Sequence, residues 1–264
     1  MKLRADAVSK TYGSGSTARL AIEPTTVSIG EEEFVTIVGP SGCGKSTFLM
    51  MMAGLLEPSG GQVLLGDQPV DGPPFGLSVV FQDYSRSLFP WMNVRRNLSM
   101  AASAYRLPKV ELAERVEHAL ESVGLAGQGD IYPWQMSGGM QQRVAIARAL
   151  VVEPKVMLMD EPFAAVDAQT RADLEDLVLT VRNEYKVTVA FVTHDIDEAV
   201  YLGDRVLVLA AGPGRMIADI PVALGRPRHQ VETKLDPRFA ELRSQVYQLV
   251  MRPSSQRPTA EATQ

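Results

Sequence analysis

The stretch Gly39-Pro40-Ser41-Gly42-Cys43-Gly44-Lys45-Ser46-Thr47 decides the fold, and the short apolar run Glu33–Val38 comes directly before it. This run is rich in β-branched residues, which favours a buried strand. The apolar segment Thr47–Leu56 follows and predicts a helix that is ended by the proline and glycines of residues 58–61. The chain therefore passes from a strand through a glycine-rich loop into a helix.

The glycine-rich loop fits the phosphate-binding pattern G-x-x-x-x-G-K-[ST]. Glycines let backbone N–H groups approach phosphate oxygens closely, and the start of the following helix adds its positive dipole end. In such a loop Lys45 supplies a positive charge to the β- and γ-phosphates, and the hydroxyl of Ser46 can bind Mg²⁺. By chance the bare pattern arises in roughly one chain of this size in a hundred. The expected phosphate-binding residues are Gly39, Pro40, Ser41, Gly42, Cys43, Gly44, Lys45, Ser46 and Thr47.

Composition limits the class of protein. The chain has 264 residues, of which 45% are apolar and 22% charged, so it can bury a large core without disulfide or metal support. One cysteine, Cys43, excludes a disulfide framework, and no apolar window is long enough to span a bilayer. The N-terminus lacks the apolar core of a secretory signal. A net charge of −5 argues against nucleic-acid binding through bulk positive charge. We expect a soluble protein of a reducing, cytoplasmic compartment.

Strand-like and helical segments alternate along the chain and predict an α/β fold. A mainly parallel sheet covered on both faces is the expected core. A long helical region at about 94–150 interrupts this alternation and predicts an inserted α-helical subdomain. The further strand-like runs are Gln62–Leu65, Ser78–Phe81, Val156–Met159, Val187–Thr193 and Arg205–Ala210.

Two acidic residues, Asp160 and Glu161, follow the apolar run Val156–Met159. On its own such a pair is usually a strand end that turns to solvent. Beside a phosphate-binding loop, however, a carboxylate at a strand end is placed to hold Mg²⁺, and we assign this role to Asp160. Glu161 would lie closer to the γ-phosphate and could activate the attacking water as a general base.

A second anion-binding element is predicted at Ser137-Gly138-Gly139, where serine and two glycines open an Ala- and Leu-rich helical segment. An ordinary helix N-cap is the alternative for an isolated Ser-Gly-Gly. The chain nevertheless has two phosphate-binding elements and one complete nucleotide site. The simplest use of the second element is to cover the γ-phosphate of a nucleotide bound to another copy of the chain.

With these motifs in this order, residues 1–225 resemble the ATP-binding subunit of an ABC transporter. The resemblance implies a P-loop NTPase core with an antiparallel β element near the N-terminus and an inserted helical subdomain, the ABC ATPase fold. It also implies ATP and Mg²⁺ as cofactors, and an ATPase whose hydrolysis of ATP drives solute translocation.

In this family an aromatic residue at the position of Tyr12 stacks on adenine, and Asp167 lies in a loop that crosses the dimer interface. Gln82 matches a glutamine that senses the γ-phosphate and metal, and His194 matches a switch histidine.

The resemblance also completes the expected site. The expected catalytic residues are Lys45, Gln82, Glu161 and His194. The expected metal ligands are Ser46, Gln82 and Asp160. Beyond the phosphate-binding loop, the expected nucleotide-binding residues are Tyr12, Gln82, Ser137, Gly138, Gly139, Gln141, Asp167 and His194.

Three segments resemble the nitrate, sulfonate and taurine importer branch of the family: the aromatic-rich region from Phe81 to Val94, Gly212-Pro213-Gly214-Arg215, and residues 226–250. The resemblance implies membrane permease subunits that dock on the Gln82–Trp91 region, and a solute-binding protein as an indirect partner. It places the chain at the cytoplasmic face of the cell membrane, as a peripheral dimer that energises import of a small anion.

The C-terminal part is expected to differ from residues 1–225. Asp236-Pro237 predicts a helix start, and Phe239, Leu242 and Val246 then fall on one helical face. We therefore divide the chain into an ATPase domain at 1–225, with a helical subdomain at about 93–150, and a C-terminal helical extension at 226–252. The tail at 253–264 is expected to be disordered.

Two other classes of protein remain open at this stage. The first is a soluble ABC ATPase of DNA repair or translation, although those proteins generally carry tandem cassettes, a coiled-coil insert or basic stretches. The second is a P-loop kinase or a switch GTPase. A kinase would not require Ser137-Gly138-Gly139, and the Asn-Lys-x-Asp loop of a GTPase is absent from the sequence.

Overall fold

The computed structural model describes residues 2–83 and 87–251, and it contains two β-sheets. The expected disordered tail and Tyr84 lie outside the described residues. The six-stranded sheet has the order β10-β9-β3-β8-β7-β6, and all neighbours in it are parallel except β9 and β10. The four-stranded sheet, β2-β1-β4-β5, is antiparallel. The predicted parallel core and N-terminal antiparallel element are both confirmed.

The strands of the first part of the chain are β1 Leu3–Tyr12, β2 Arg19–Ile29, β3 Phe34–Val38, β4 Gly60–Leu65, β5 Gln68–Pro69 and β6 Leu77–Val80. Those of the second part are β7 Val156–Asp160, β8 Thr188–Val192, β9 Arg205–Ala210 and β10 Arg215–Pro221. The helices are α1 Lys45–Met52, α3 Val94–Ala101, α4 Lys109–Ser122, α5 Gly138–Leu150, α6 Ala168–Tyr185, α7 Ile196–Leu202, α8 Glu232–Leu235 and α9 Pro237–Val250.

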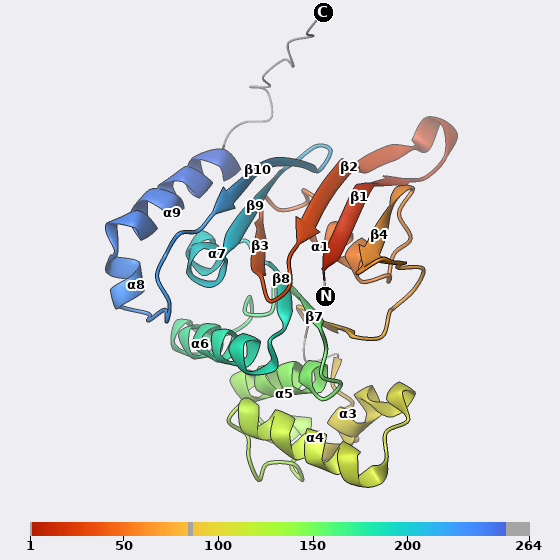
Figure 1. Ribbon diagram of the computed structural model, residues 1–264, viewed down its shortest axis with the longest axis vertical. Helices are drawn as coiled ribbons and strands as arrows, with labels where there is room; N and C mark the ends of the chain where they lie inside the picture. The colour runs from red at the N-terminus through yellow and green to blue at the C-terminus, as the bar shows by residue number, and fades with distance from the viewer. Residues whose placement is uncertain (1, 84–86, 252–264) are drawn as a thin grey trace, which may run out of the picture.

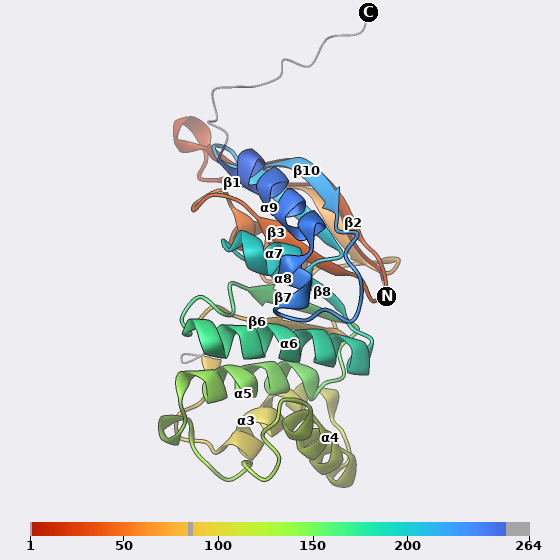
Figure 2. The ribbon, with the colours of Figure 1, turned by 90° about the vertical axis from the view of Figure 1, so that its left-hand side faces the viewer.

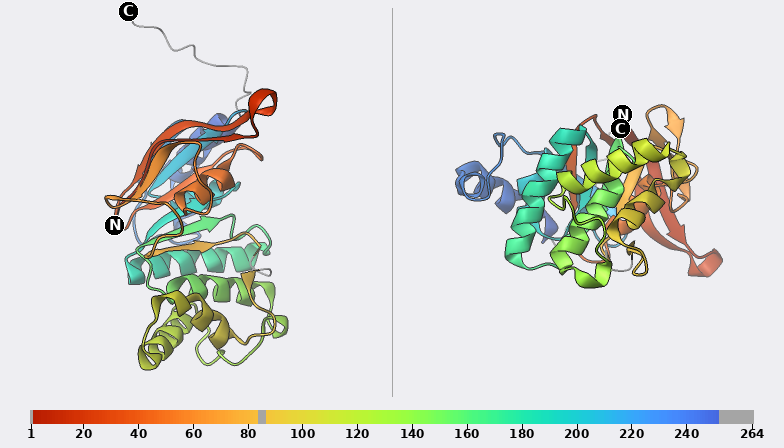
Figure 3. Two further views of the ribbon diagram at one scale, coloured as in Figure 1. Left: turned by 90° about the vertical axis from the view of Figure 1, so that its right-hand side faces the viewer. Right: turned by 90° about the horizontal axis from the view of Figure 1, so that it is seen from below.

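The central strands of the six-stranded sheet are buried on both faces. Every residue of β3, β7 and β8 is buried, which explains why these strands read as continuous apolar runs. Within β3, Phe34 and Val38 join the hydrophobic core that includes α5, α6 and α7, whereas Val35 and Ile37 join the core around α1. Figure 3 shows α1 lying between the two sheets. The core strand therefore separates two packed layers.

The helical segment splits where the sequence indicated one long helical region. Helices α3, α4 and α5 are separated by loops and by the short 3₁₀ turns Ser103–Tyr105 and Pro133–Gln135. In Figure 1 these three helices form the lower end of the molecule, and Figure 2 shows α5 running alongside α6. The start of α5 therefore lies in the helical layer, while α1 and its preceding loop lie in the sheet region.

Helix α1 is shorter than the sequence predicts. It begins at Lys45 and ends at Met52, not at Leu56. The chain turns at Gly54, which has φ +68°, and a Cβ atom there would lie 2.2 Å from the carbonyl oxygen of Gly72. The helix therefore ends because a loop from elsewhere in the chain passes close to Gly54, before Pro58 is reached.

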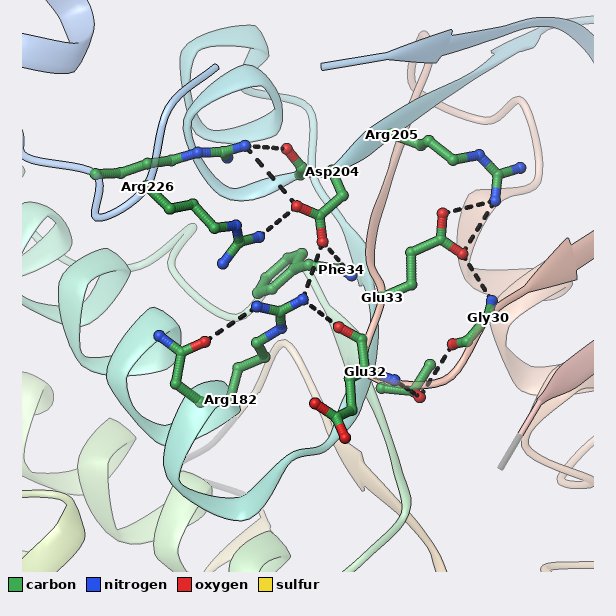
Figure 4. A network of polar contacts seen from close by, with 12 residues as sticks. Gly30, Glu32, Glu33, Phe34, Arg182, Asp204, Arg205 and Arg226 are labelled. Atoms are coloured by element: carbon green, nitrogen blue, oxygen red, sulfur yellow. Dashed lines mark hydrogen bonds and ion pairs between the residues drawn. The ribbon is translucent and has the colours of Figure 1, made fainter. Parts of the chain in front are cut away.

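Helix α9 packs against α7 and β9, and α8 packs against α9 (Figure 2). Asp236 caps α9 by accepting a hydrogen bond from the N–H of Arg238 at 2.9 Å, as the sequence predicts. Asp204 lies between Arg182 of α6 and Arg226 of the C-terminal segment, and it also accepts a hydrogen bond from the N–H of Phe34 at 2.9 Å (Figure 4). One carboxylate thus ties three distant segments together.

Arg228 is the most buried charge in this connection, with a side chain only 1% exposed. Its guanidinium donates to the carbonyl oxygens of Tyr201 and Gly203, the latter at 2.8 Å, and so caps the C-terminal end of α7. Burial lowers the pKa of Arg228 to about 10, which leaves the guanidinium charged at neutral pH. The extension is therefore fastened to the helix that follows His194.

We expect Arg228→Ala to lower the free energy of unfolding by roughly 2–4 kcal/mol, because buried carbonyls lose their donors and a packed side chain is removed. Chemical denaturation measures this change. Arg243→Ala is the matched control, because Arg243 pairs with Asp197 of the same helix α7 but its side chain is 60% exposed. The control should lose about 0–1 kcal/mol. Equal losses in the two variants would show that the buried cap does not fasten the extension.

Candidate functional site

The phosphate-binding loop adopts a backbone that only glycine tolerates at its end. Gly44 caps α1 with φ +97°, and a Cβ atom there would lie 2.3 Å from Cδ1 of Ile22 in β2. Gly39, at the start of the loop, is similarly confined, because its Cβ would lie 2.4 Å from the carbonyl oxygen of Leu209 in β9. The loop is therefore held between strands of both sheets.

The loop wraps around its own lysine. The Lys45 side chain is 6% exposed, and its ammonium donates to the carbonyl oxygens of Gly39 at 2.9 Å and Pro40 at 3.4 Å. The same ammonium lies 3.7 Å from a carboxylate oxygen of Glu161. A buried cation requires such partners. Lys45 thus lies next to Glu161, the residue that directly follows β7.

Ser46 and Asp160 form the second contact of the site. The Ser46 hydroxyl donates to Oδ1 of Asp160 at 2.9 Å. Burial raises the pKa of Asp160, and the hydrogen bond from Ser46 and the charge of Lys45 act in the opposite direction. A hydroxyl and a carboxylate are oxygen ligands of the kind that Mg²⁺ takes, together with phosphate oxygens and water. Among the described residues there is no group of three or more His, Cys, Asp or Glu that could hold a metal ion.

Glu161 has a strained backbone and links two strands. Its φ of +42° is left-handed, which costs of the order of 1 kcal/mol or more for a residue other than glycine and is typical of functional sites. Its N–H donates to the carbonyl oxygen of Val192 at 2.9 Å, at the end of β8. Its carboxylate lies 2.9 Å from Nδ1 of His194, whose side chain is 59% exposed. The Glu161 carboxylate is therefore shared by Lys45 and His194.

The structure therefore brings five of the residues expected from the sequence together in one connected group. Lys45 and His194 both contact Glu161, and Ser46 contacts Asp160, the neighbour of Glu161 in β7. The expected roles of these residues in catalysis and metal binding stay predictions.

Two other expected residues lie at strand ends. Gln82 is exposed and follows β6, the neighbour of β7 in the sheet. Tyr12 ends β1, its side chain is 46% exposed, and the Lys10 ammonium lies 5.5 Å from its ring centroid. Both residues are open to solvent, as contacts with a bound nucleotide would require.

The residues expected to cover a nucleotide from a second copy lie at two helix starts. Ser137 caps α5 by accepting from the N–H of Met140 at 3.3 Å, and Asp167 caps α6 by accepting from Thr170. A Cβ atom on Gly139 would lie 2.6 Å from the methyl group of Thr170, so the two helix starts are neighbours. Gln141 turns its amide back to the carbonyl oxygens of the 3₁₀ turn before α5, including that of Pro133 at 2.9 Å. These two hydrogen bonds hold the turn against the start of α5.

Three polar residues next to His194 were not predicted from the sequence as part of the site. Thr193 donates its hydroxyl to Glu198 of α7 at 2.6 Å, and Arg171 of α6 lies 3.5 Å from the same carboxylate. A local signal for Glu198 did exist, because Asp195 three residues earlier completes the spacing of a helix capping box. In the structure Asp195 caps α7, but the Glu198 carboxylate contacts Thr193.

A model of the ABC transporter family matches residues 22–164 of the chain. The chain belongs to the ABC transporter family. This match contains the phosphate-binding loop, Ser137-Gly138-Gly139, and Asp160 and Glu161 at the end of β7. The family resemblance predicted from the motifs is confirmed, and the chain is an ATP-binding, ATP-hydrolysing cassette.

Relatives of the chain include transport proteins. It is 48% identical over 231 residues to a Brucella abortus protein named for ATP binding, with 88% of each chain covered. It is 42% identical over 253 residues to the nitrate import ATP-binding protein of Synechococcus elongatus, covering 95% of this chain and 92% of that one. A bicarbonate transport ATP-binding protein of the same species is 44% identical over 236 residues, which are 88% of this chain and 35% of the relative.

Solved structures confirm the ABC ATPase fold. A Clostridium perfringens protein, described as part of the ABC transporter complex CbiONQ, matches with a TM-score of 0.75 and 31% identity, over 83% of this chain and 88% of that one. A dimeric ATP-binding cassette in a post-hydrolysis state, bound to ADP and Pi, matches with a TM-score of 0.72 and 31% identity, over 83% and 98%. Within the described parts of our chain, no helix has the length and apolar character needed to cross a membrane.

Stability should depend on pH through Glu198. Burial is the main reason that the pKa of Glu198 rises from 4.5 to about 7; nearby Asp195 and Glu175 raise it further, while Thr193 and Arg171 lower it. Because the folded protein favours the protonated carboxyl group, the contribution of Glu198 to stability is complete below pH 4.5. This contribution is lost as the pH rises through 7. Glu198→Gln removes this titration. We expect its free energy of unfolding, relative to the parent protein, to be higher at pH 8 than at pH 5. A pH-independent difference in urea denaturation would contradict this expectation.

Proposed function

We propose that this chain is the ATP-hydrolysing subunit of an importer for small anions such as nitrate, a sulfonate or taurine. In this proposal two copies form a dimer that docks on membrane permease subunits at the cytoplasmic face of the membrane. The observation that carries the ATPase part is the contact of Lys45 and His194 with one carboxylate, that of Glu161. The names of the nitrate and bicarbonate transport relatives support an anion as the solute.

Glu161 is the proposed general base. Lys45 and His194 both pair with its carboxylate, and a terminal phosphate would offer these two donors stronger, charge-assisted hydrogen bonds. Phosphate binding would then release Glu161 from both partners. The freed carboxylate could accept a proton from the attacking water. The hydrogen bond from the Glu161 N–H to the carbonyl oxygen of Val192 would keep the residue in place.

Ser46 and Asp160 are the proposed metal ligands, with Gln82 as a third ligand from the end of β6. Mg²⁺ held there would neutralise charge on the β- and γ-phosphates. The buried Asp160 carboxyl, with its raised pKa, is a group that a cation would stabilise in the ionised form.

A second copy would complete each nucleotide site. Ser137 and Gly138 at the start of α5 are exposed, and this helix start lies in the helical layer, apart from the phosphate-binding loop (Figure 1). Two copies in head-to-tail arrangement would bring the α5 start of one copy over the loop of the other. Asp167, beside Gly139, would lie in the same interface.

A groove beside β6 is the proposed permease contact. It encloses about 350 Å³ between β6, α3 and α5, and its walls include Phe89, Met100 and Tyr105. Trp91, which packs against Phe89 at 5.6 Å between ring centroids, is 69% exposed at the rim. The groove is partly apolar and holds one cation, Arg148, whose pKa is lowered by burial. A short amphipathic helix with an acceptor facing Arg148 would fit this chemistry.

The base role is tested by Glu161→Gln, which keeps the size of the side chain and removes the proton acceptor. We expect ATP turnover to fall by about 10²–10⁴-fold, while ATP binding persists and a dimer accumulates. Phosphate release and light scattering with ATP measure the two effects. Glu241→Gln on the exposed face of α9 is the control and should behave as the parent protein. Turnover of the Glu161→Gln variant close to that of the parent would rule out Glu161 as the base.

The permease contact is tested by Ala101→Trp, which fills the groove. We expect co-purification with the membrane subunits to weaken by at least about tenfold, since 1.4 kcal/mol of lost binding suffices for that change. ATP hydrolysis by the isolated chain should be unaffected. Val110→Trp, at an exposed position of α4, is the matched control. Unchanged co-purification, or capture of ribosomes or DNA by the parent protein, would contradict the transport proposal and favour an ABC ATPase of translation or repair.

A further inference from the structure

A polar cluster of Arg171, Thr193, Asp195 and Glu198 lies directly behind His194. Its members come from three segments: α6, the loop after β8, and α7. These residues line a small cavity of about 10 Å³, room for one water molecule, together with Glu161, Ala164 and His194. The cluster and the proposed reaction site therefore share this cavity, because Glu161 and His194 line it as well.

Hydrogen bonds hold both the backbone and the side chain of Thr193. Its backbone N–H donates to the carbonyl oxygen of Ile37 in β3 at 3.1 Å, which extends the sheet by one residue. Its hydroxyl donates to Glu198 at 2.6 Å and accepts from the N–H of Asp195 at 2.9 Å. The hydroxyl thus bridges the residue after His194 and the helix beyond it. As a result, the backbone on both sides of His194 is held, although the His194 side chain itself is largely exposed.

Glu198 is the acceptor on which this arrangement depends. It is buried, with 5% exposure, and its carboxylate receives the Thr193 hydroxyl on one oxygen and faces Arg171 on the other. Burying a carboxyl group is costly unless it is hydrogen-bonded and paired. The position therefore carries an energetic cost that packing alone does not explain, because a leucine or methionine would fill the same space without it.

Arg171 connects the same cluster to the loop before α6. Its guanidinium reaches Asp195 at 3.3 Å and the carbonyl oxygen of Val166 at 3.5 Å, and it lies 3.5 Å from Glu198. Val166 immediately precedes Asp167, the residue expected at the dimer interface. One side chain thus touches the segment after His194 and the segment before Asp167.

We propose that Glu198 and Arg171 are positioning residues for ATP hydrolysis: through Thr193 and Val166 they hold the His194 and Asp167 loops in one fixed relation. This inference rests on the proposed function, because it assumes that His194 contacts the γ-phosphate. In a dimer, movement of the Asp167 loop at the interface would reach His194 through Arg171 and Glu198. The cluster thereby makes the position of one loop depend on that of the other.

The test compares Glu198→Ala, Glu198→Gln and Thr193→Val in steady-state ATPase assays, with binding of a fluorescent ATP analogue measured separately. Glutamine keeps an oxygen that can accept from Thr193, whereas alanine and valine each remove one end of that bond. We expect Glu198→Ala and Thr193→Val to lower kcat by about 10–100-fold with little change in nucleotide affinity, because small misplacements of a catalytic group have effects of this size. Glu198→Gln should recover most of the lost kcat.

Glu175→Gln is the matched control. Glu175 is another buried carboxyl on α6, but its contacts are with Gln230 and Lys234 of the C-terminal segment. Its kcat should equal that of the parent protein. A loss of kcat equal to that of Glu198→Ala, or a Glu198→Gln variant as impaired as Glu198→Ala, would show a general packing effect and overturn the proposal.

His194→Ala in the same assay separates the two proposals. If His194→Ala loses turnover while Thr193→Val and Glu198→Ala keep it, the positioning role is wrong and the proposed function stands. If His194→Ala itself turns over as the parent does, the proposed function fails at its switch residue. Should Glu198→Ala not fold, the comparison of Thr193→Val with Glu198→Gln still decides, because parent-like kcat in Thr193→Val contradicts the inference.

Discussion

The burial of the Lys45 ammonium is the constraint from which the rest of the site follows. A charge with only 6% exposure must be surrounded by acceptors, and the loop provides them by bending its own carbonyl groups inward. This bend requires glycine at the two positions where the loop comes closest to β2 and to β9, which are Gly44 and Gly39. The loop therefore encloses one cation, while its glycines Gly44 and Gly39 pack against strands of the two sheets.

Around Lys45 the site is organised by shared partners. Glu161 is common to Lys45 and His194, and Arg171 is common to the segments that carry His194 and Asp167. A change at any one contact alters what its neighbour can bind. The C-terminal segment joins the same framework from the other end of α7, where Arg228 holds the last carbonyl groups of that helix. Segments far apart in the sequence thus meet on one short helix.

The sequence predicted most of the fold because its signals are local. The phosphate-binding loop, the buried parallel strands and the Asp236 cap are each readable within about ten residues. The early end of α1 was not predictable, because it depends on Gly72 approaching Gly54. The contact of Glu198 with Thr193 was not predictable, because the local sequence pattern indicates a capping box instead. The cap by Arg228 was not predictable either, because it joins residues more than two dozen positions apart. Contacts between side chains that lie far apart in the sequence produce no local sequence pattern from which they could be predicted.

Strand β6 forms one edge of the six-stranded sheet and one wall of the groove. The hydroxyl of Ser78 on this strand is buried, and among the described residues it has no hydrogen-bond partner. An edge strand beside apolar side chains offers a template for unwanted pairing with other chains. The chain should accordingly be easiest to keep monodisperse in solution when it is produced together with whatever molecule covers this edge.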